Sequence, residues 1–327
     1  MTNISSKRLA IIGGGNIASF HVPALRAAGM NIVHCASSLN SKTIHQFAKN
    51  HNIEQIWSDP KKLAAAHHDW DGMVITSAVE PTLDLLEIAA STGKPVLVEK
   101  PVASSPEKLA KFSSNSPSNI IVAYNRRHYS TIKKARDFIA EKKSVRATMT
   151  LPENVSQQMA NPFYLVYENS VHGFDILNFV FGGVTVEHIA TASADDPYFG
   201  RQAILKSKDG LLINLIMNWR APANFTLSLD DADERLDLFP FEKYQLYKGM
   251  QVIEPSDEYP VRQYVPNQVD SGTVFDDMPS DIKPGFLGQS QEFSDLIDGR
   301  KPEIGANLTD AYQALVIAHK VVKNTKS

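Results

Sequence analysis

The chain has 327 residues, 43% of them hydrophobic and 21% charged, with a formal net charge of −3 at pH 7. This length predicts two domains, and the composition is that of an ordinary globular protein. The charge, without a long basic run, argues against nucleic acid as the main partner, because phosphate binding needs clustered Lys and Arg. No signal-peptide core or membrane-length apolar run is present, so we expect a cytoplasmic protein without a membrane partner.

The first third of the chain alternates short apolar runs with helical patterns. Strands are predicted over residues 9–12, 31–35, 73–76, 96–98 and 120–124, and helices over 17–28, 41–50, 61–67, 82–91 and 106–113. Ser41 or Asn40 is the expected cap of the second helix. The single cysteine, Cys35, fits a reducing compartment and is expected in the core. These strand–helix units predict an α/β fold with a doubly wound parallel sheet.

After residue 124 the strand patterns become longer. Helices are predicted over 129–141, 166–180 and 307–324, and strands over 144–151, 185–193, 202–206, 211–218, 225–230 and 236–238. A mostly antiparallel sheet follows, and we place the domain boundary between residues 124 and 125. The resulting domains are 1–124 and 125–327. The Pro-, Asp- and Ser-rich residues 254–283 predict an irregular surface excursion, with a lid or a subunit-contact loop as the alternative.

A glycine cluster stands between the first apolar run and the first helical pattern. Gly13, Gly15 and Ala18 fit G-x-G-x-x-A, the dinucleotide fingerprint in its alanine variant. The first Gly permits a tight turn, the second permits close approach of a pyrophosphate, and the small third residue permits helix–strand packing. With Asn16 and Ile17, the loop would present backbone N–H groups at the positive helix end. The alternative is a glycine-rich turn without a ligand.

The residues after the second predicted strand bear on the choice between NAD and NADP. An acid about 20 residues past the glycines normally binds the ribose hydroxyls of NAD, but residues 33–40 contain no Asp or Glu. Ser37, Ser38 and Lys42 are candidates to hold a 2′-phosphate, which an acid would repel. We therefore favour NADP(H) over NAD(H), although the usual Arg is absent. The alternative is that the serines only cap the next helix.

Two further segments carry side chains suited to catalysis. Lys100, in Glu99-Lys100-Pro101, follows a buried strand, and ligands of open α/β sheets bind beyond the carboxyl ends of strands. In a helix, Glu168 and His172 share a face, with Asp175 near the histidine, which is typical of a proton-transfer group. The alternatives are a solvated surface lysine and a structural histidine. Because no open set of three spaced ligands stands apart from these motifs, we expect no metal.

The glycine loop, Glu99-Lys100-Pro101, Tyr124-Asn125-Arg126-Arg127 and the segment around His172 occur in a familiar order. Together they resemble the glucose–fructose oxidoreductase / inositol dehydrogenase / MocA family over essentially the whole chain. The resemblance implies a Rossmann domain joined to a C-terminal α/β domain whose large open sheet often makes oligomer contacts. It implies hydride transfer between a nicotinamide and a hydroxyl or keto carbon of a sugar, cyclitol or nucleotide-sugar, and a homodimer or homotetramer.

The resemblance also assigns roles to individual residues. Lys100 would lie between nicotinamide and substrate and hydrogen-bond the reacting oxygen, and His172 would transfer the proton. Glu168 stands where the family often has Asp, which keeps the charge but moves the carboxylate. The N-H-x-H pattern usual after the strand at 73–76 is missing, which leaves Thr76 or Ser77 as the cofactor contact.

The remaining candidates surround these positions. Glu99 is expected beside the cofactor. Asn125, Arg126 and Arg127 lie at the predicted domain junction and could contact cofactor or an anionic substrate, with a surface role for one or both arginines as the alternative. Two other functions stay open: a non-enzymatic regulator that senses the cofactor, and an NAD-assisted glycosidase.

Overall fold

The computed structural model describes residues 7–38, 41–142, 144–155, 163–196, 198–276 and 278–323. The chain forms two compact units, the first comprising 1–128 with 278–316 and the second 129–277 with 317–327. The first is built on a parallel sheet and the second on a mostly antiparallel one, which confirms the predicted fold class. The predicted boundary between residues 124 and 125 stays a prediction. In the described part of the chain, no helix is both long and apolar enough to cross a membrane.

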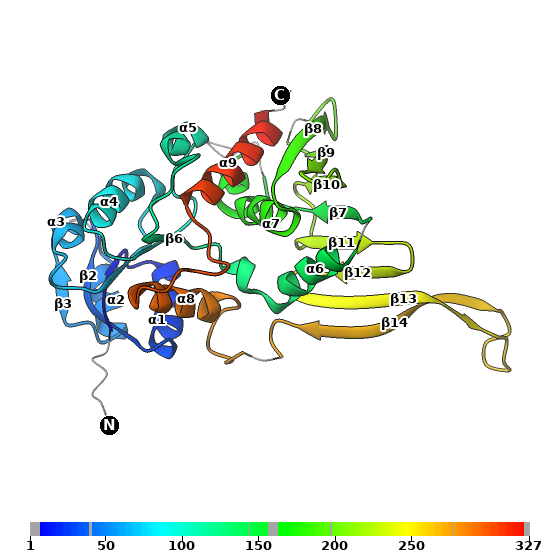
Figure 1. The fold of residues 1–327 in the computed structure, drawn as a ribbon, viewed down its shortest axis with the longest axis horizontal. Helices are drawn as coiled ribbons and strands as arrows, with labels where there is room; N and C mark the ends of the chain where they lie inside the picture. The colour runs from blue at the N-terminus through cyan, green and yellow to red at the C-terminus, as the bar shows by residue number, and fades with distance from the viewer. Residues whose placement is uncertain are drawn as a thin grey trace. The chain divides into compact units, whose positions relative to one another are not determined.

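The sheet of the first unit has six parallel strands in the order β3-β2-β1-β4-β5-β6 (Figure 1). Their bounds are β1 Lys7–Ile12, β2 Met30–Ala36, β3 Gln55–Trp57, β4 Gly72–Ile75, β5 Val96–Val98 and β6 Ile120–Val122. The strand order reverses between β1 and β4, which is where open α/β sheets bind ligands. Strand β3 was not predicted, because this three-residue edge strand is mostly exposed and therefore lacks an apolar run.

Helices cover both faces of this sheet. Their bounds are α1 Asn16–Ala27, α2 Ile44–Asn50, α3 Pro60–Ala65, α4 Val79–Ser91, α5 Pro106–Leu109, which continues as a 3₁₀ turn at Ala110–Phe112, and α8 Phe286–Ile297. The cap predicted for α2 was wrong, because Thr43 occupies its N-cap position; Asn40 lies outside the described residues. Helix α8 was not predicted, and it packs through Phe286 against Ala24 of α1.

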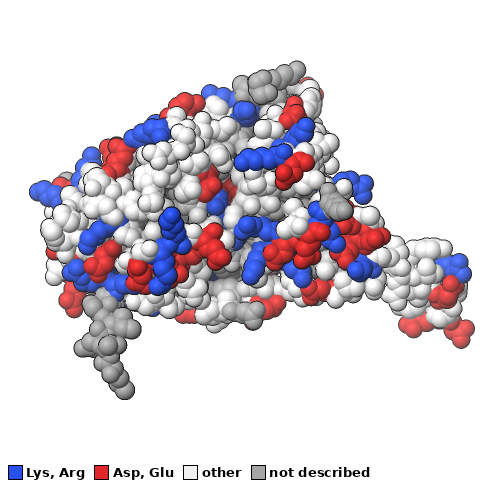
Figure 2. Space-filling model, viewed as in Figure 1, with Lys and Arg blue, Asp and Glu red and all other residues white. Residues whose placement is uncertain are grey.

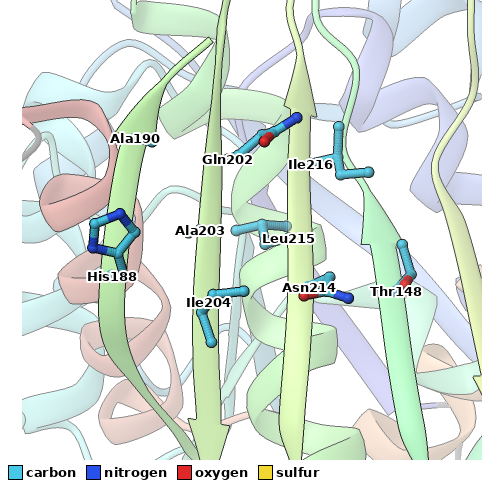
Figure 3. Close-up of a pocket in the computed structure, with 9 residues that line it drawn as sticks. All are labelled: Thr148, His188, Ala190, Gln202, Ala203, Ile204, Asn214, Leu215 and Ile216. Carbon is cyan, nitrogen blue, oxygen red and sulfur yellow. The ribbon is translucent and has the colours of Figure 1, made fainter.

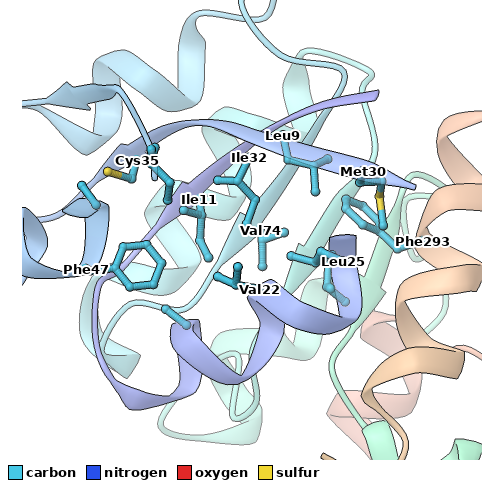
Figure 4. Close-up of a cluster of buried hydrophobic side chains, with 14 of the residues drawn as sticks. Leu9, Ile11, Val22, Leu25, Met30, Ile32, Cys35, Phe47, Val74 and Phe293 are labelled. Atoms are coloured by element: carbon cyan, nitrogen blue, oxygen red, sulfur yellow. The ribbon is translucent and has the colours of Figure 1, made fainter. Parts of the chain in front are cut away.

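One core of the first unit joins α1, α2 and α8 to the strands (Figure 4). Its fully buried side chains include Leu9 and Ile11 of β1, Leu25 of α1 and Phe293 of α8. Cys35 lies in the same cluster, as predicted, and burial raises the pKa of its thiol to about 11. The cysteine therefore acts as a small apolar core residue, since its thiol is almost never ionised near neutral pH.

The second unit contains an eight-stranded sheet in the order β14-β13-β12-β11-β7-β10-β9-β8. The bounds are β7 Arg146–Thr150, β8 Val184–Thr191, β9 Gly200–Ser207, β10 Leu212–Asn218, β11 Thr226–Asp230, β12 Glu234–Leu238, β13 Lys243–Ile253 and β14 Gln263–Thr273. Only β7 and β10 pair in parallel among these strands. The helices of this unit are α6 Ser130–Glu141, α7 Val171–Phe181 and the end of α9 Leu308–Lys323.

One face of this sheet is open. Cross-strand neighbours His188, Ile204, Asn214 and Thr148 form a row across β8, β9, β10 and β7. They line a shallow hollow of about 430 Å³ (Figure 3). The large open sheet that the family resemblance implied is therefore present.

The predicted irregular excursion at 254–283 was wrong in part. Strands β13 and β14 form a long antiparallel hairpin, which we call the β13–β14 arm (residues 243–273), and only its turn at 254–262 is irregular. The arm carries large apolar side chains that are 47–67% exposed: Met250, Val252, Tyr259, Val261, Tyr264 and Val269. Proline at position 266 and the unpaired polar edge hid β14 from the sequence pattern, because proline in strands is confined to edges and bulges.

Candidate functional site

The candidate cofactor residues gather at one edge of the parallel sheet. Gly13 follows β1, Ser37 follows β2, Thr76 follows β4, and Glu99 and Lys100 follow β5. Because the carboxyl ends of parallel strands meet at the same edge, residues up to 87 positions apart in the chain share this edge. The structure therefore brings these candidates to one sheet edge, and their contact with a ligand stays a prediction.

Gly13 is required by a close approach of two strands. Its φ is +116°, and a Cβ there would lie 2.3 Å from Oγ1 of Thr76 and 2.6 Å from the Thr76 carbonyl oxygen. Thr76 is held in place because its backbone N–H and its hydroxyl both donate to the carbonyl of Ile12, at 2.7 and 3.0 Å. The first glycine of the fingerprint therefore makes room for the end of β4 as well as for the turn.

The second glycine leaves open space in front of a helix. No described atom lies within 4 Å of the position that a Cβ on Gly15 would occupy. Gly15 is the N-cap of α1, no side chain caps this helix, and its first turn has no acid. Asn16 is exposed and Ala18 is fully buried. Free N–H groups, a positive helix end and room for close approach fit the diphosphate of a dinucleotide.

Ser37 and Ser38 lie at the end of β2, half-buried and exposed respectively. The Ser38 carbonyl accepts a hydrogen bond from the Ser41 N–H at 2.9 Å. Helix α2 begins later, at Ile44, behind Thr43. The alternative that these serines cap α2 is therefore wrong, whereas a contact with the cofactor stays a prediction.

Ser77 has a local role at the start of α4. Its hydroxyl lies 2.8 Å from the Thr82 hydroxyl, which donates to the Ala78 carbonyl at 2.8 Å. This turn ties the loop after β4 to the helix that follows it. Any contact between Ser77 and the cofactor would have to coexist with these bonds.

Glu99 is buried at the end of β5 and has a partner that the sequence analysis missed. Oε1 of Glu99 lies 2.7 Å from Nε2 of His21, which is fully buried in α1. Oε2 of Glu99 accepts the backbone N–H of Lys100 at 3.1 Å. The available signal was a polar residue at a buried position of an amphipathic helix, three residues after Ala18.

Asn125 and Arg127, which follow β6, make hydrogen bonds within the first unit. The Asn125 amide donates to the Pro284 carbonyl at 2.9 Å. Arg127 is only 5% exposed and bonds the Ile304 carbonyl and Asp310, both at 3.3 Å. The alternative of a surface role is therefore wrong for Arg127. Arg126 is half-buried, and its contact with a ligand stays a prediction.

His172 lies in α7 of the second unit and is 6% exposed. The continuous α-helix predicted over 166–180 was wrong in its first turn, because Val166–Ser170 is a π-helical turn. Glu168 lies in this turn and accepts a hydrogen bond from the Tyr164 hydroxyl. The wider turn alters the simple four-residue spacing used for Glu168 and His172, and π-turns are frequent at functional sites.

A second carboxylate that the sequence analysis missed supports this π-helical turn. Glu153, which follows β7 and is 8% exposed, accepts the Ser170 hydroxyl at 2.6 Å and the Asn169 amide at 3.2 Å. Both partners directly precede α7. An acid just past a predicted strand was the signal that could have identified it. Across the described residues, no group of three or more His, Cys, Asp or Glu is arranged to hold a metal ion.

Comparisons with known proteins agree with these motifs. Residues 7–115 match the family model described as the oxidoreductase family with an NAD-binding Rossmann fold, named for GFO, IDH and MocA. Inositol 2-dehydrogenase of Rhizobium meliloti is 26% identical over 196 residues, which span 57% of this chain and 58% of that protein. The chain therefore spans somewhat more than half the length of this curated relative.

Solved structures share the fold of the whole chain. An oxidoreductase from Agrobacterium radiobacter, in complex with NAD+, L-tartaric acid and magnesium, has a TM-score of 0.75 at 14% identity, covering 98% of this chain and 96% of its own. A candidate NADPH-dependent oxidoreductase from Desulfitobacterium hafniense has a TM-score of 0.76 at 18% identity, with the same coverage.

The fold and the family match define an oxidoreductase class with an NAD-binding Rossmann domain. Over residues 7–115 the chain matches the glucose–fructose oxidoreductase / inositol dehydrogenase / MocA family, so the predicted resemblance is confirmed for this part of the chain.

Proposed function

We propose that the protein is an NAD(P)-dependent dehydrogenase or reductase that acts on a hydroxyl or keto carbon of a sugar, cyclitol or nucleotide-sugar. One observation carries this proposal. The open N-terminus of α1 at Gly15 comes after β1 and Lys100 comes after β5, so both lie at the carboxyl-end edge of the same parallel sheet. A dinucleotide bound at the first would direct its nicotinamide along the edge on which the second stands. The similarity to an inositol 2-dehydrogenase supports a polyol-like substrate.

The chemistry follows from the charges of the proposed catalytic residues. A bound nicotinamide would supply the hydride acceptor or donor. The Lys100 ammonium hydrogen-bonds the reacting oxygen and stabilises the negative charge that develops on it. His172 accepts the hydroxyl proton during oxidation and returns it during reduction. The Glu168 carboxylate orients Lys100 and His172 or adds a negative charge beside them. Asn125 and Arg126 contribute to substrate binding.

We propose NADP(H) as the preferred cofactor and NAD(H) as the alternative. The first described residues after β2 are the neutral Ser37 and Ser38, so no carboxylate there repels a 2′-phosphate. Gly13, Gly15, Asn16, Ile17, Ala18, Thr76, Ser77 and Glu99 complete the proposed cofactor site.

The test combines binding and turnover. NADPH and NADH are titrated by fluorescence, and the preferred cofactor is then supplied with a panel of inositols, sugars and nucleotide-sugars. Lys100→Met should leave cofactor binding intact and lower turnover by about 10²–10⁴-fold. Lys108→Met, at an exposed lysine of the same unit, is the matched control and should retain activity.

Other outcomes identify other functions. Full activity of Lys100→Met on a verified substrate removes the lysine from the mechanism. Tight binding of the cofactor without turnover on any substrate favours a cofactor-sensing regulator. Release of an aglycone from a glycoside, with no net change in cofactor absorbance, identifies an NAD-assisted glycosidase.

We also propose that the protein is a homodimer or homotetramer. The open sheet face and the exposed apolar side chains of the β13–β14 arm support this, because monomers rarely expose large contiguous apolar patches. On the face in Figure 2, by contrast, Lys and Arg are interspersed with Asp and Glu over much of the surface. Sedimentation of native protein and of a Val261→Asp, Tyr264→Ser variant tests this: the variant should shift towards monomer.

A cytoplasmic location stays a prediction.

A further inference from the structure

Glu99, a member of the proposed cofactor site, forms a buried pair with His21, and the proton and hydride transfers proposed above give this pair no role. His21 is 0% exposed, Glu99 is 8% exposed, and 78 residues of sequence separate them. A carboxylate accepts hydrogen bonds, so Nε2 of His21 is the donor across the 2.7 Å separation. Such a pair is costly to bury unless its geometry is good, and each partner holds the other in place.

The imidazole of His21 is itself fixed by packing. Its ring centroid lies 4.8 Å from that of Phe286, the first residue of α8. Nδ1 of His21 has no hydrogen-bond partner among the described residues, so the bond from Nε2 to Glu99 is its polar anchor. The ring therefore directs one hydrogen bond towards the end of β5.

Glu99 connects His21 to Lys100, because its carboxylate is hydrogen-bonded to both residues. With Oε1 bound to His21, its Oε2 is aimed at the backbone N–H of Lys100, 3.1 Å away. The backbone N–H of Glu99 donates to the Ile75 carbonyl of β4 at 2.8 Å. The chain is therefore held from two sides at the point where it leaves β5, and one of these sides is α1.

We infer that His21 and Glu99 are positioning residues for Lys100. The pair links α1, whose open N-terminus is the proposed diphosphate site, to the turn that bears the proposed catalytic lysine. It sets the position of the Lys100 backbone relative to the cofactor-binding helix without touching the substrate. This inference rests on the proposed function for its kinetic consequence, although its structural part does not.

The first test uses variants that separate the hydrogen bond from packing. His21→Phe keeps a ring against Phe286 but removes the donor, whereas His21→Gln keeps an N–H donor. In His21→Phe we expect kcat to fall roughly 10–100-fold, because small misplacements of catalytic groups are costly, with the Kd for NAD(P)H unchanged within a few-fold. His21→Gln should recover most of the lost kcat.

A double variant shows whether His21 acts through the lysine. If it does, His21→Phe should cause no further loss of kcat in a Lys100→Met background, because two residues that act as a unit are not additive. An equal loss in both backgrounds would mean that His21 has only a structural role, and would overturn the inference.

The second test does not depend on turnover. Hydrogen–deuterium exchange of the peptide 96–103 reports the Lys100 N–H, which the Glu99 carboxylate protects. Exchange there should be about tenfold faster in His21→Phe and near native in His21→Gln, with native rates for the second-unit strand Leu212–Asn218 as control. If native protein turns over no substrate, the proposed function fails while this readout still tests the pair. Native exchange at Lys100 in folded His21→Phe would refute the positioning role.

Discussion

Gly13 and Thr76 approach so closely that a Cβ at residue 13 would lie 2.3 Å from the threonine Oγ1. Moving Thr76 away from residue 13 would break two hydrogen bonds to the Ile12 carbonyl. Gly13→Ala should therefore destabilise the fold by about 2–4 kcal/mol, from overpacking and from a left-handed φ. Urea denaturation measures this, and a loss below 0.5 kcal/mol, on the order of an ordinary surface substitution, would contradict it.

Gly15→Ala is the informative counterpart in the same loop. No described atom lies within 4 Å of its would-be Cβ, so we expect a change in stability below about 1 kcal/mol. The added methyl group occupies the space proposed for the diphosphate, and binding of NADPH should weaken by roughly tenfold or more. Fluorescence titration checks this. Unchanged binding in the folded variant would place the diphosphate elsewhere.

The charge at Ser38, the second residue after β2, should control the choice of cofactor. Ser38→Asp places a carboxylate at an exposed position beyond this strand. Repulsion of a 2′-phosphate should weaken NADPH binding by roughly tenfold while NADH is affected much less. Ser113→Asp, at another exposed serine of the first unit, controls for added charge. An equal effect on both cofactors would remove Ser38 from the 2′-phosphate site.

The ion pair between Arg127 and Asp310 should contribute to the stability of the first unit. Arg127 is almost fully buried and bonds Asp310 and the Ile304 carbonyl at 3.3 Å. Arg127→Met should cost about 1–3 kcal/mol, because it removes a buried donor and leaves two half-buried acceptors without this partner. Arg262→Met breaks the exposed pair with Glu254 and should cost less than about 1 kcal/mol. Similar losses in the two variants would show that burial is not the cause.

His128 should make the fold sensitive to acid. Burial, and then the nearby Arg127 charge, lower the pKa of His128 to about 4, below the ordinary histidine value of 6.5. Between these values the unfolded chain binds a proton that the folded chain does not, so stability is lost as pH falls from 6.5 towards 4. The full loss from this residue is about 3 kcal/mol.

Denaturation of native protein and His128→Asn at pH 7 and pH 4.5 measures this contribution. The native protein should lose about 2–3 kcal/mol more than the variant between the two pH values. The exposed His68→Asn serves as the control and should behave like the native protein. A variant that loses as much stability as the native chain would show that other groups dominate the acid response.

Hydrophobic patterns in the sequence identified the strands and helices that have a buried face. The buried strands β1, β4 and β5 read as short apolar runs, and the glycine cluster at 13–15 stands between the first of them and α1. By contrast, β3 is a short exposed edge, and the β13–β14 arm is exposed and interrupted by Pro266. Elements without a buried face carry little periodic signal, which is why these were missed.

The sequence by itself determined the class of fold, the dinucleotide fingerprint at Gly13 and Gly15, and the position of Lys100 beyond a strand end. Each follows from residues that are neighbours in the chain, where backbone geometry and burial act over a few positions. Only the tertiary structure decided that His21 binds Glu99, because the two meet only once α1 has packed on the sheet. The tertiary structure also gave Gly13 a second role. This glycine is required for the turn and also for the close approach of Thr76, 63 residues further along the chain.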